Sequence, residues 1–285
     1  MLKGYTKQEI SWMMYDWANS AHSVIIVTLL PIFFDTVAGY TADSVSSMST
    51  WGYATSIAML IVALAAPFLG VFGDIRGMRK KLFSFFMLLG VAACAGMAFT
   101  PGMDFTSGPV AAGKVATLIL VLYIVSVIGF DASAIYYDAF LTDVTIEDRM
   151  DKVSTMGYGL GYIGGSTIPL LIFLIMNLVG VPMLTCLAFV FGLTAVWWLA
   201  FSLPLLKNCE QTSGKPYEKG DVARSIKGVG TTIKEIIANK PMLIYILSYF
   251  FYIDGVHTVI SMATTYGTNL GLDSTGMMLA LLLVQ

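Results

Sequence analysis

Residues 70–81 read GVFGDIRGMRKK, a short basic segment with an apolar stretch on each side. The flanking stretches, at about 52–72 and 82–100, are each long enough to cross a hydrocarbon layer of ~30 Å as a helix. Basic residues in such a short connection favour the cytoplasmic side of a membrane. The sequence around this segment therefore predicts two membrane-spanning helices joined by a short inner loop.

The composition extends this prediction to the whole chain. Apolar residues make up 57% and charged residues 12% of the chain, whereas soluble domains carry roughly 25% charged residues. We therefore expect an all-α, polytopic membrane protein. An eighth apolar stretch begins near Ser274 and reaches Gln285 after about half a span, which indicates a longer protein. The seven complete stretches cover about 12–35, 52–72, 82–100, 116–140, 156–178, 183–204 and 241–266.

The basic residues are distributed unequally between the two sides of the predicted membrane. With the N-terminus inside, every Lys and Arg except Lys114 falls in the N-terminal tail or in an inner connection. Positive charge is enriched in cytoplasmic loops of membrane proteins. We therefore expect a cytoplasmic N-terminus, and the compact loops and short N-terminal tail favour a bacterial inner membrane.

A polar segment divides the chain into two parts. Residues 1–204 hold six spans, and residues 205–240 are rich in Lys, Glu, Gly and Ser. We interpret 205–240 as a solvated cytoplasmic linker rather than a regulatory domain, and 241–285 as the start of a second bundle. The sequence HSVI at 22–25 recurs as HTVI at 257–260. This is either a chance match or the parallel repeat expected of a transporter built from two related six-helix bundles.

Four aspartates lie inside stretches that are otherwise apolar and carry no Lys or Arg. A charged side chain at the centre of a bilayer costs at least ~2.5–3.5 kcal/mol, so such residues usually face a cavity; the alternative is that some cap a helix or hydrogen-bond a neighbouring one. Asp131 and Asp254 lie deep in their spans. We expect them to carry protons or to contact a cationic group, because burial favours the neutral carboxyl. Asp16 and Asp138 lie near the inner edge, where we expect them to act at a gate.

Two histidines and an asparagine accompany these acids. Asn19 and His22 approach the midplane of the first span, and His257 lies in the seventh. The repeat places Asn19 opposite Asp254, each three residues before its histidine. We expect Asn19, His22 and His257 to hydrogen-bond a substrate.

The inner loop resembles a signature of the major facilitator superfamily, G-x-x-x-D-x-x-G-x-[RK]-[RK]. Glycines permit a tight turn and close helix approach, and an aspartate can pair with a helix N-terminus or a nearby base. The resemblance implies a gating loop between the second and third spans, whereas an ordinary positive-inside turn is the alternative. The matching positions are Gly70, Asp74, Gly77, Arg79 and Lys80.

A second resemblance runs along the whole chain. YDWANSAHS at 15–23, GYGLGYIGG at 157–165 and YIDGVHT at 252–258, together with Val153-Ser154 and Arg149, look like the vacuolar amino-acid effluxers of autophagy and their bacterial relatives. This resemblance implies a secondary transporter with twelve spans in two bundles, in which helices 1, 4, 7 and 10 line a central cavity. It also implies amino acids as a candidate substrate class, since amino-acid export is attached to the eukaryotic branch.

The fifth span carries a stripe of glycines. Gly157, Gly161 and Gly165 recur every four residues, with Gly164 beside the last. Small residues at this spacing let another helix pack closely, so we interpret them as a packing face. The run partly resembles the glycine-rich fifth helix of facilitator antiporters, although Tyr162 stands where that motif has proline.

These observations predict a secondary active transporter that moves a small organic solute by alternating access, coupled to protons and with export as one direction. The alternatives are a channel or non-transporting receptor, and an intramembrane aspartyl protease, for which the G-x-G-D partner is missing. The cysteines and histidines have no metal-site spacing, and the near P-loop at 108–115 lacks its final Ser or Thr. We expect that the protein is not an enzyme and that it binds no cofactor, metal or nucleic acid. We expect a monomer whose partners are a small-molecule substrate, protons and the lipid bilayer.

Overall fold

The computed structural model describes residues 3–41, 44–216, 221–273, 276–277 and 279–280. Within this part of the chain, seven helical segments are long and apolar enough to cross a membrane. The predicted all-α fold class and the seven complete spans are therefore confirmed. The eighth stretch, from Ser274, falls largely outside the described residues. The spans are Lys7–Ala38, Ser47–Gly73, Arg79–Gly102, Pro109–Val144, Glu147–Leu178, Met183–Asn208 and Lys240–Asn269.

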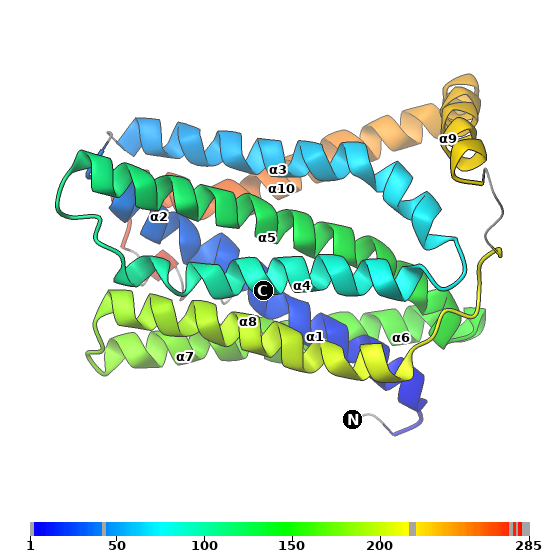
Figure 1. The fold of residues 1–285 in the computed structure, drawn as a ribbon, viewed down its shortest axis with the longest axis horizontal. Helices are drawn as coiled ribbons and strands as arrows, with labels where there is room; N and C mark the ends of the chain where they lie inside the picture. Colours follow the sequence, from blue (N-terminus) through cyan, green and yellow to red (C-terminus); the bar gives the residue numbers. More distant parts are fainter. Residues whose placement is uncertain (1–2, 42–43, 217–220, 274–275, 278, 281–285) are drawn as a thin grey trace.

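The first six spans lie side by side along the long axis of the molecule (Figure 1). The first consists of two α-helices, the fifth of two α-helices joined by a π-helix, and the third ends in a short 3-10 turn. The helices are α1 (Lys7–Thr28), α2 (Leu30–Ala38), α3 (Ser44–Gly73), α4 (Arg79–Met97), η1 (Thr100–Gly102), α5 (Pro109–Val144), α6 (Glu147–Leu160), η2 (Gly161–Ser166), α7 (Thr167–Leu178), α8 (Met183–Asn208), α9 (Asp221–Ala238) and α10 (Lys240–Asn269).

Local sequence explains where several helices begin or break. Thr6 and Glu9 form a reciprocal cap on α1: the Glu9 N–H donates to the Thr6 hydroxyl at 3.1 Å, and the Thr6 N–H donates to the Glu9 carboxylate at 2.7 Å. The first span is interrupted at Leu29, two residues before Pro31, because proline has no N–H to continue the helical ladder. Pro109 occupies the first turn of α5, where its fixed φ is tolerated.

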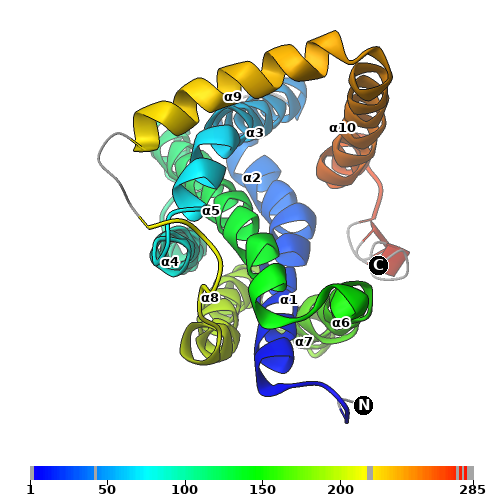
Figure 2. The same cartoon turned by 90° about the vertical axis from the view of Figure 1, so that its right-hand side faces the viewer.

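The α1 helix lies at the centre of the six-span bundle. It packs against α5, α8 and the α6–η2 segment, as Figure 2 shows from the inner end. One cluster of buried apolar side chains surrounds Phe33 and Trp51, and a second surrounds Trp12 and Trp198. The α1 helix carries Trp12 and continues through α2 to Phe33, so its polar side chains lie between two packed apolar regions.

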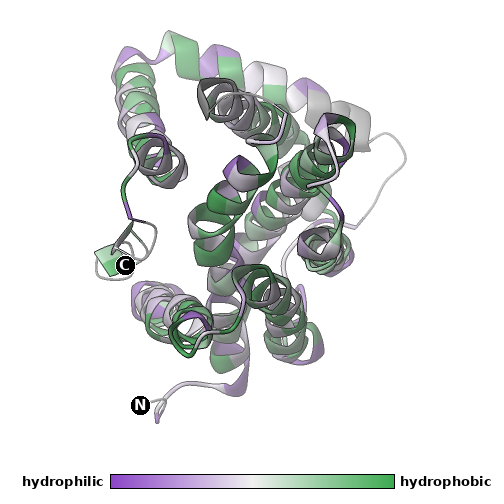
Figure 3. Ribbon diagram, turned by 90° about the vertical axis from the view of Figure 1, so that its left-hand side faces the viewer, coloured by the Kyte–Doolittle hydropathy of each residue, from purple (hydrophilic) through white to green (hydrophobic). Residues whose placement is uncertain are grey.

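The outer surface of the spans is apolar. Leu60 and Leu64 on α3 and Val196 on α8 are exposed, and hydrophobic residues colour most of the span ribbons in Figure 3. Exposed apolar side chains are normal for helices that contact lipid rather than water. The surface therefore agrees with a multi-pass membrane protein.

The segment after the sixth span contains a further helix, α9, between residues 221 and 238. The α8 helix continues to Asn208. Residues 209–215, here called the strap, follow it, and Lys215 pairs through its backbone with Asp74 and Arg76 in the loop between α3 and α4. The α9 helix crosses the same end of the bundle at a steep angle to the spans (Figures 1 and 2) and contacts α3 and α10. We call this end, which carries Gly4 and the 74–78 loop, the inner end.

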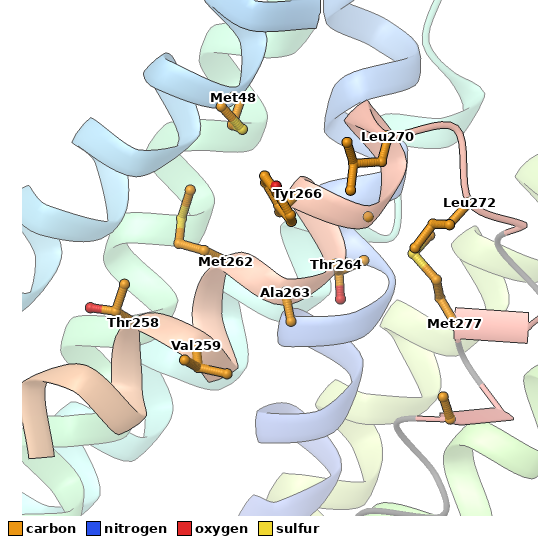
Figure 4. Close-up of a pocket in the computed structure, with 12 residues that line it drawn as sticks. Met48, Thr258, Val259, Met262, Ala263, Thr264, Tyr266, Leu270, Leu272 and Met277 are labelled. Atoms are coloured by element: carbon orange, nitrogen blue, oxygen red, sulfur yellow. The ribbon is translucent and has the colours of Figure 1, made fainter.

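The α10 helix packs on the six-span bundle only near its outer end. Met262 joins the apolar cluster around Trp51, and the buried residues of α10 are Thr264, Thr265 and Gly267. Figure 4 shows Met262 lining an apolar pocket together with Met48 of α3. From 240 to 260 its residues are exposed or half-buried. The inner part of α10 is thus not covered by the first six spans.

Candidate functional site

The carboxylate of Asp16 is buried at the contact between α1 and α5. Asp16 is 7% exposed, and the hydroxyl of Tyr137 donates a hydrogen bond of 2.7 Å to the Oδ2 atom of Asp16. Tyr137 is itself held by Trp12: the two rings stack with centroids 4.3 Å apart, and the Trp12 indole donates to the Tyr137 carbonyl at 2.9 Å. The α1 and α5 helices therefore fix this acid through two aromatic side chains.

A second acid lies beside this pair but points outward. Asp138 follows Tyr137 on α5 and is exposed, and its carboxyl interacts electrostatically with that of Asp16. Tyr158 of α6, also exposed, interacts with both acids. Among the described residues, no Lys, Arg or His lies within ion-pair distance of either carboxyl. The inner half of the bundle thus combines two acids that lack a basic partner with the hydroxyl groups of two tyrosines.

The histidine of α1 faces the core. His22 is 2% exposed, and its ring lies against Phe130 and Trp198, with centroids 4.8 and 5.0 Å away. Neither ring nitrogen has a hydrogen-bond partner among the described residues. Asn19, one turn earlier, is also buried and is 8% exposed. In this conformation the His22 ring is enclosed by aromatic side chains, and its contact with a substrate stays a prediction.

Asp131, seven residues before Asp138 on α5, is half-buried. It interacts electrostatically with Tyr123, whose hydroxyl lies 3.0 Å from the Thr55 hydroxyl. Thr55 also donates to the carbonyl of Trp51 at 3.1 Å. Asp131 therefore belongs to a polar group distinct from the one around Asp16.

The two predicted site residues of α10 stand apart. Asp254 and His257 are exposed and form no hydrogen bond or ion pair with the other predicted site residues in the described structure. The structure thus brings Asp16 and Asp138 together, places Asp131 separately, and leaves these two on the uncovered part of α10.

The glycines of the fifth span lie against α1. A Cβ atom on Gly157 would collide with the Asp16 carboxylate, one on Gly161 would lie 2.6 Å from the Ser20 hydroxyl, and one on Gly164 would enter the Trp17 ring. A Cβ on Gly165 would lie 2.5 Å from the Trp17 carbonyl oxygen. The absence of side chains here is what lets the fifth span approach Asp16.

The π-helix η2 at Gly161–Ser166 is not apparent from the sequence pattern. Such single wide turns are rare and occur frequently at functional sites. The only signal for it is the run of small residues, which reads equally well as an α-helical packing stripe. Its position beside α1 links the backbone geometry of the fifth span to the Asp16 region.

At the inner loop, Arg79 is buried and joins three chain segments. It pairs with Asp143 at the end of α5 and donates to the Ala139 carbonyl at 3.0 Å and the Ser213 hydroxyl at 3.1 Å. Asp74 is exposed, with one oxygen 3.8 Å from the Arg79 guanidinium. Gly77 has a φ of 82°, a left-handed conformation that side chains disfavour.

The strap completes this network, which sequence reasoning missed. The Gln211 side chain accepts hydrogen bonds from the N–H groups of Gly77 and Arg79, at 2.8 and 3.2 Å, and donates to the Gly73 carbonyl at 3.0 Å. The backbone N–H groups of residues 212 and 213 donate to Asp143, at 3.1 and 2.9 Å. Lys80 donates to the carbonyl of residue 209 at 3.1 Å. No periodicity in the sequence predicts these polar contacts.

A separate ion pair lies at the inner end beside the N-terminus. The Arg149 guanidinium donates to both oxygens of Glu9 at 2.8 Å, and the Thr145 hydroxyl donates to the same carboxylate at 2.7 Å. Arg149 also donates to the carbonyl of Gly4 at 2.9 Å. The start of α1 is thereby attached to the connection between α5 and α6.

Comparison with known proteins identifies the family. A family model described as vacuole effluxer Atg22-like matches residues 5–146 and 143–285. The chain belongs to this Atg22-like family. It is 40% identical over 293 residues to an uncharacterized transporter of the major facilitator type, YxiO of Bacillus subtilis (strain 168), covering 100% of this chain and 66% of that protein.

A more distant relative and one solved structure are also similar to the chain. Autophagy-related protein 22-1 of Penicillium rubens is 26% identical over 136 residues, which cover 44% of this chain and 23% of that protein. The crystal structure of a D-xylose–proton symporter superposes with a TM-score of 0.60 at 14% identity, over 98% of this chain and 65% of the other. The Atg22-like chain thus has a major facilitator fold and spans about two thirds of the length of YxiO and of the symporter.

Proposed function

We propose that this Atg22-like chain forms part of a secondary active transporter that moves a small organic solute by alternating access. The observation that carries the proposal is the pair formed by buried Asp16 and exposed Asp138, with no basic partner in the described structure. Unpaired acids inside a membrane bundle are costly and mark substrate or proton pathways. The names of YxiO and of the symporter describe transporters, which supports this class rather than an enzyme.

The chemistry of the site favours a solute with a protonated amine. Two carboxyl groups and the phenol of Tyr158 attract a cation, and the ring can add a cation–π contact. Amino acids carry such an amine and remain the candidate substrate class for the Atg22-like family. A carboxyl that is freed from the amine can take up a proton instead, so the same acids would couple solute movement to protons. Asp131 and Asp254 would form the deeper part of this route.

The arrangement of α10 supports an inward-facing state. Its outer end packs against α2 and α3, whereas none of its residues from 240 to 260 is buried against the first six spans. In alternating access, two bundles rock around a central site, so closing one side opens the other. With the N-terminus inside, as the basic loops favour, Asp138 would face the cytoplasm. The inner-loop network around Arg79 would hold the first bundle rigid during this movement.

Transport by the full-length protein in proteoliposomes tests the proposal. We expect saturable, pH-gradient-dependent flux of an amino acid first identified by thermal shift. Asp138→Asn should lower this flux about tenfold or more, because a charged hydrogen bond contributes ~1.5–3 kcal/mol. Asp151→Asn removes an exposed acid on α6 and serves as the matched control.

Three outcomes would contradict the proposal. Unaltered flux in Asp138→Asn and Asp16→Asn together would exclude these acids from the route. Non-saturable flux would indicate a channel, and ligand binding without flux would indicate a receptor.

A further inference from the structure

A cavity lined by hydroxyl groups lies between α3 and α10, and we call it the hydroxyl pocket. Its volume is about 370 Å³, and its remaining lining residues are Gly52 and Met262. None of the lining residues is charged. Because a hydroxyl both donates and accepts, this lining suits uncharged hydrogen-bonding groups better than ions. The hydroxyl-bearing residues are Ser49, Tyr53, Thr55 and Ser56 of α3, and Thr258 and Ser261 of α10.

Helical spacing directs these hydroxyl groups toward one another. Residues 49, 53 and 56 of α3 share one helical face, as do residues 258 and 261 of α10. Met262 lies against Gly52, where a Cβ atom would be 3.7 Å from its terminal methyl carbon. Figure 4 shows Met262 on the part of α10 that lies beside α3. The missing side chain at Gly52 thus lets the two helices meet while the pocket stays open between them.

Three of the hydroxyls are available to a ligand. Ser261 donates within its own helix, to the His257 carbonyl at 2.7 Å. By contrast, the hydroxyls of Tyr53, Ser56 and Thr258 have no hydrogen-bond partner in the part of the chain that the structure describes. Hydroxyls inside a membrane bundle are unfavourable without a partner, so these groups favour a solute that carries a hydroxyl or amide.

An acid lies one helical turn from the pocket, toward the inner end. Asp254 precedes Thr258 by four residues, which places both side chains on the same face of α10 with their Cβ atoms ~6 Å apart. Asp254 is exposed and has no ion-pair partner among the described residues. The amine of an amino acid is only a few bonds from its side chain. One amino acid can therefore reach Asp254 with its amine and the hydroxyl pocket with its side chain.

We propose that the hydroxyl pocket binds the side chain of an amino acid that ends in a hydroxyl or amide, while Asp254 binds the amine. This inference rests on the proposed transport function and names the substrate class within it. Charged side chains are rejected because no lining residue can pair with them. Apolar side chains are rejected because they would leave the hydroxyls of Tyr53, Ser56 and Thr258 unpaired.

Threonine and valine test the pocket directly, because they have nearly the same shape and differ by one hydroxyl. Calorimetric titration of the purified full-length protein should show at least about fivefold tighter binding of threonine, the contribution of one hydrogen bond. Thr258→Val and Ser56→Ala should each reduce this preference and together abolish it. Thr117→Val removes an exposed hydroxyl of α5 and should leave the preference unchanged.

Asp254→Asn separates the amine contact from the side-chain contact. It should weaken threonine and valine equally, by about tenfold, because both carry the same amine. The preference for threonine over valine should therefore remain. Unchanged affinities in Asp254→Asn, or a lost preference, would overturn the assignment of the amine to this acid.

The hydroxyl pocket and the transport function can fail separately. Equal affinity for threonine and valine would overturn the pocket, as would an unchanged preference in the double variant or no binding of threonine, serine and asparagine. Amino-acid flux without such a preference would contradict the pocket alone. A threonine preference without flux would instead contradict the transporter and leave the pocket in place.

Protection from labelling provides a second measurement. Ser56 is exposed and the three native cysteines are buried, so a maleimide should react selectively with Ser56→Cys. Saturating threonine should slow this reaction several-fold, and the same concentration of valine should slow it less. Lys114→Cys, at an exposed position near the start of α5, is the control and should label at the same rate with and without threonine. Equal labelling of position 56 with and without threonine would place the ligand elsewhere and overturn the proposal.

Discussion

The hydroxyl of Tyr137 donates a hydrogen bond of 2.7 Å to the buried carboxylate of Asp16. This contact joins α5 to α1 across 121 residues of sequence. Its consequence is that neighbouring residues on α5 have different environments: Tyr137 is committed to the interior, whereas Asp138 faces outward. Packing therefore holds Asp16 in place and leaves Asp138 accessible to a solute.

Removing this hydroxyl should destabilise the bundle. In Tyr137→Phe, the ring can still stack on Trp12, but the Asp16 carboxylate loses its donor. Leaving a buried polar group without a partner costs ~1–3 kcal/mol, so the melting temperature in detergent should fall. Tyr162→Phe removes an exposed hydroxyl of the fifth span and should not lower it. Equal melting temperatures for the two variants would show that Asp16 does not depend on Tyr137.

The fifth span should be sensitive to side-chain volume at one glycine and tolerant at its near neighbour. In Gly157→Ala, the new methyl group would collide with the Asp16 carboxylate and lie 3.3 Å from the Trp12 ring. Such overpacking costs ~1–3 kcal/mol. Gly159→Ala meets nothing within 4 Å and should stabilise the helix slightly. Thermal unfolding of both variants measures the difference, and a stable Gly157→Ala protein would mean that α1 and α6 are farther apart.

The ion pair between Glu9 and Arg149 should require the arginine geometry. Lysine at position 149 keeps the charge but lacks the planar pair of N–H donors that lets Arg149 bind one Glu9 oxygen with each. We expect Arg149→Lys to cost ~1 kcal/mol or more, because Glu9 is buried and Arg149 is partly exposed. Proteolysis of the N-terminal tail should accelerate accordingly. Lys7→Gln changes an exposed charge nearby, and an equal acceleration there would contradict a specific role for the pair.

The thiol of Cys209 should report whether the strap is docked. Burial raises its pKa to about 12, so at neutral pH the reactive thiolate is nearly absent and labelling by a maleimide should be slow. Gln211→Ala removes three hydrogen bonds that hold the strap and should increase the labelling rate about tenfold. Glu210→Gln, an exposed neighbour, is the control, and equal rates in both variants would argue against docking through Gln211.

The candidate site was only partly predictable. The sequence placed Asp16 and Asp138 at the inner edge because span depth follows from residue counting. It could not show that Tyr137 would bind Asp16, since a tyrosine in an apolar helix reads as packing. It also could not show that Phe130 and Trp198 would surround the His22 ring. Helix rotation, which decides these orientations, depends on all neighbouring helices together.

By itself, the sequence determined how many complete helices cross the membrane in this chain, because hydrophobic length and charge are properties of each segment alone. The tertiary structure decided which polar groups meet. The docking of the strap on Arg79, the separation of Asp16 from Asp131 and the crossing of α9 over the inner end all depend on contacts between distant segments. Such contacts follow from packing and hydrogen-bond satisfaction across helices, which no local pattern encodes.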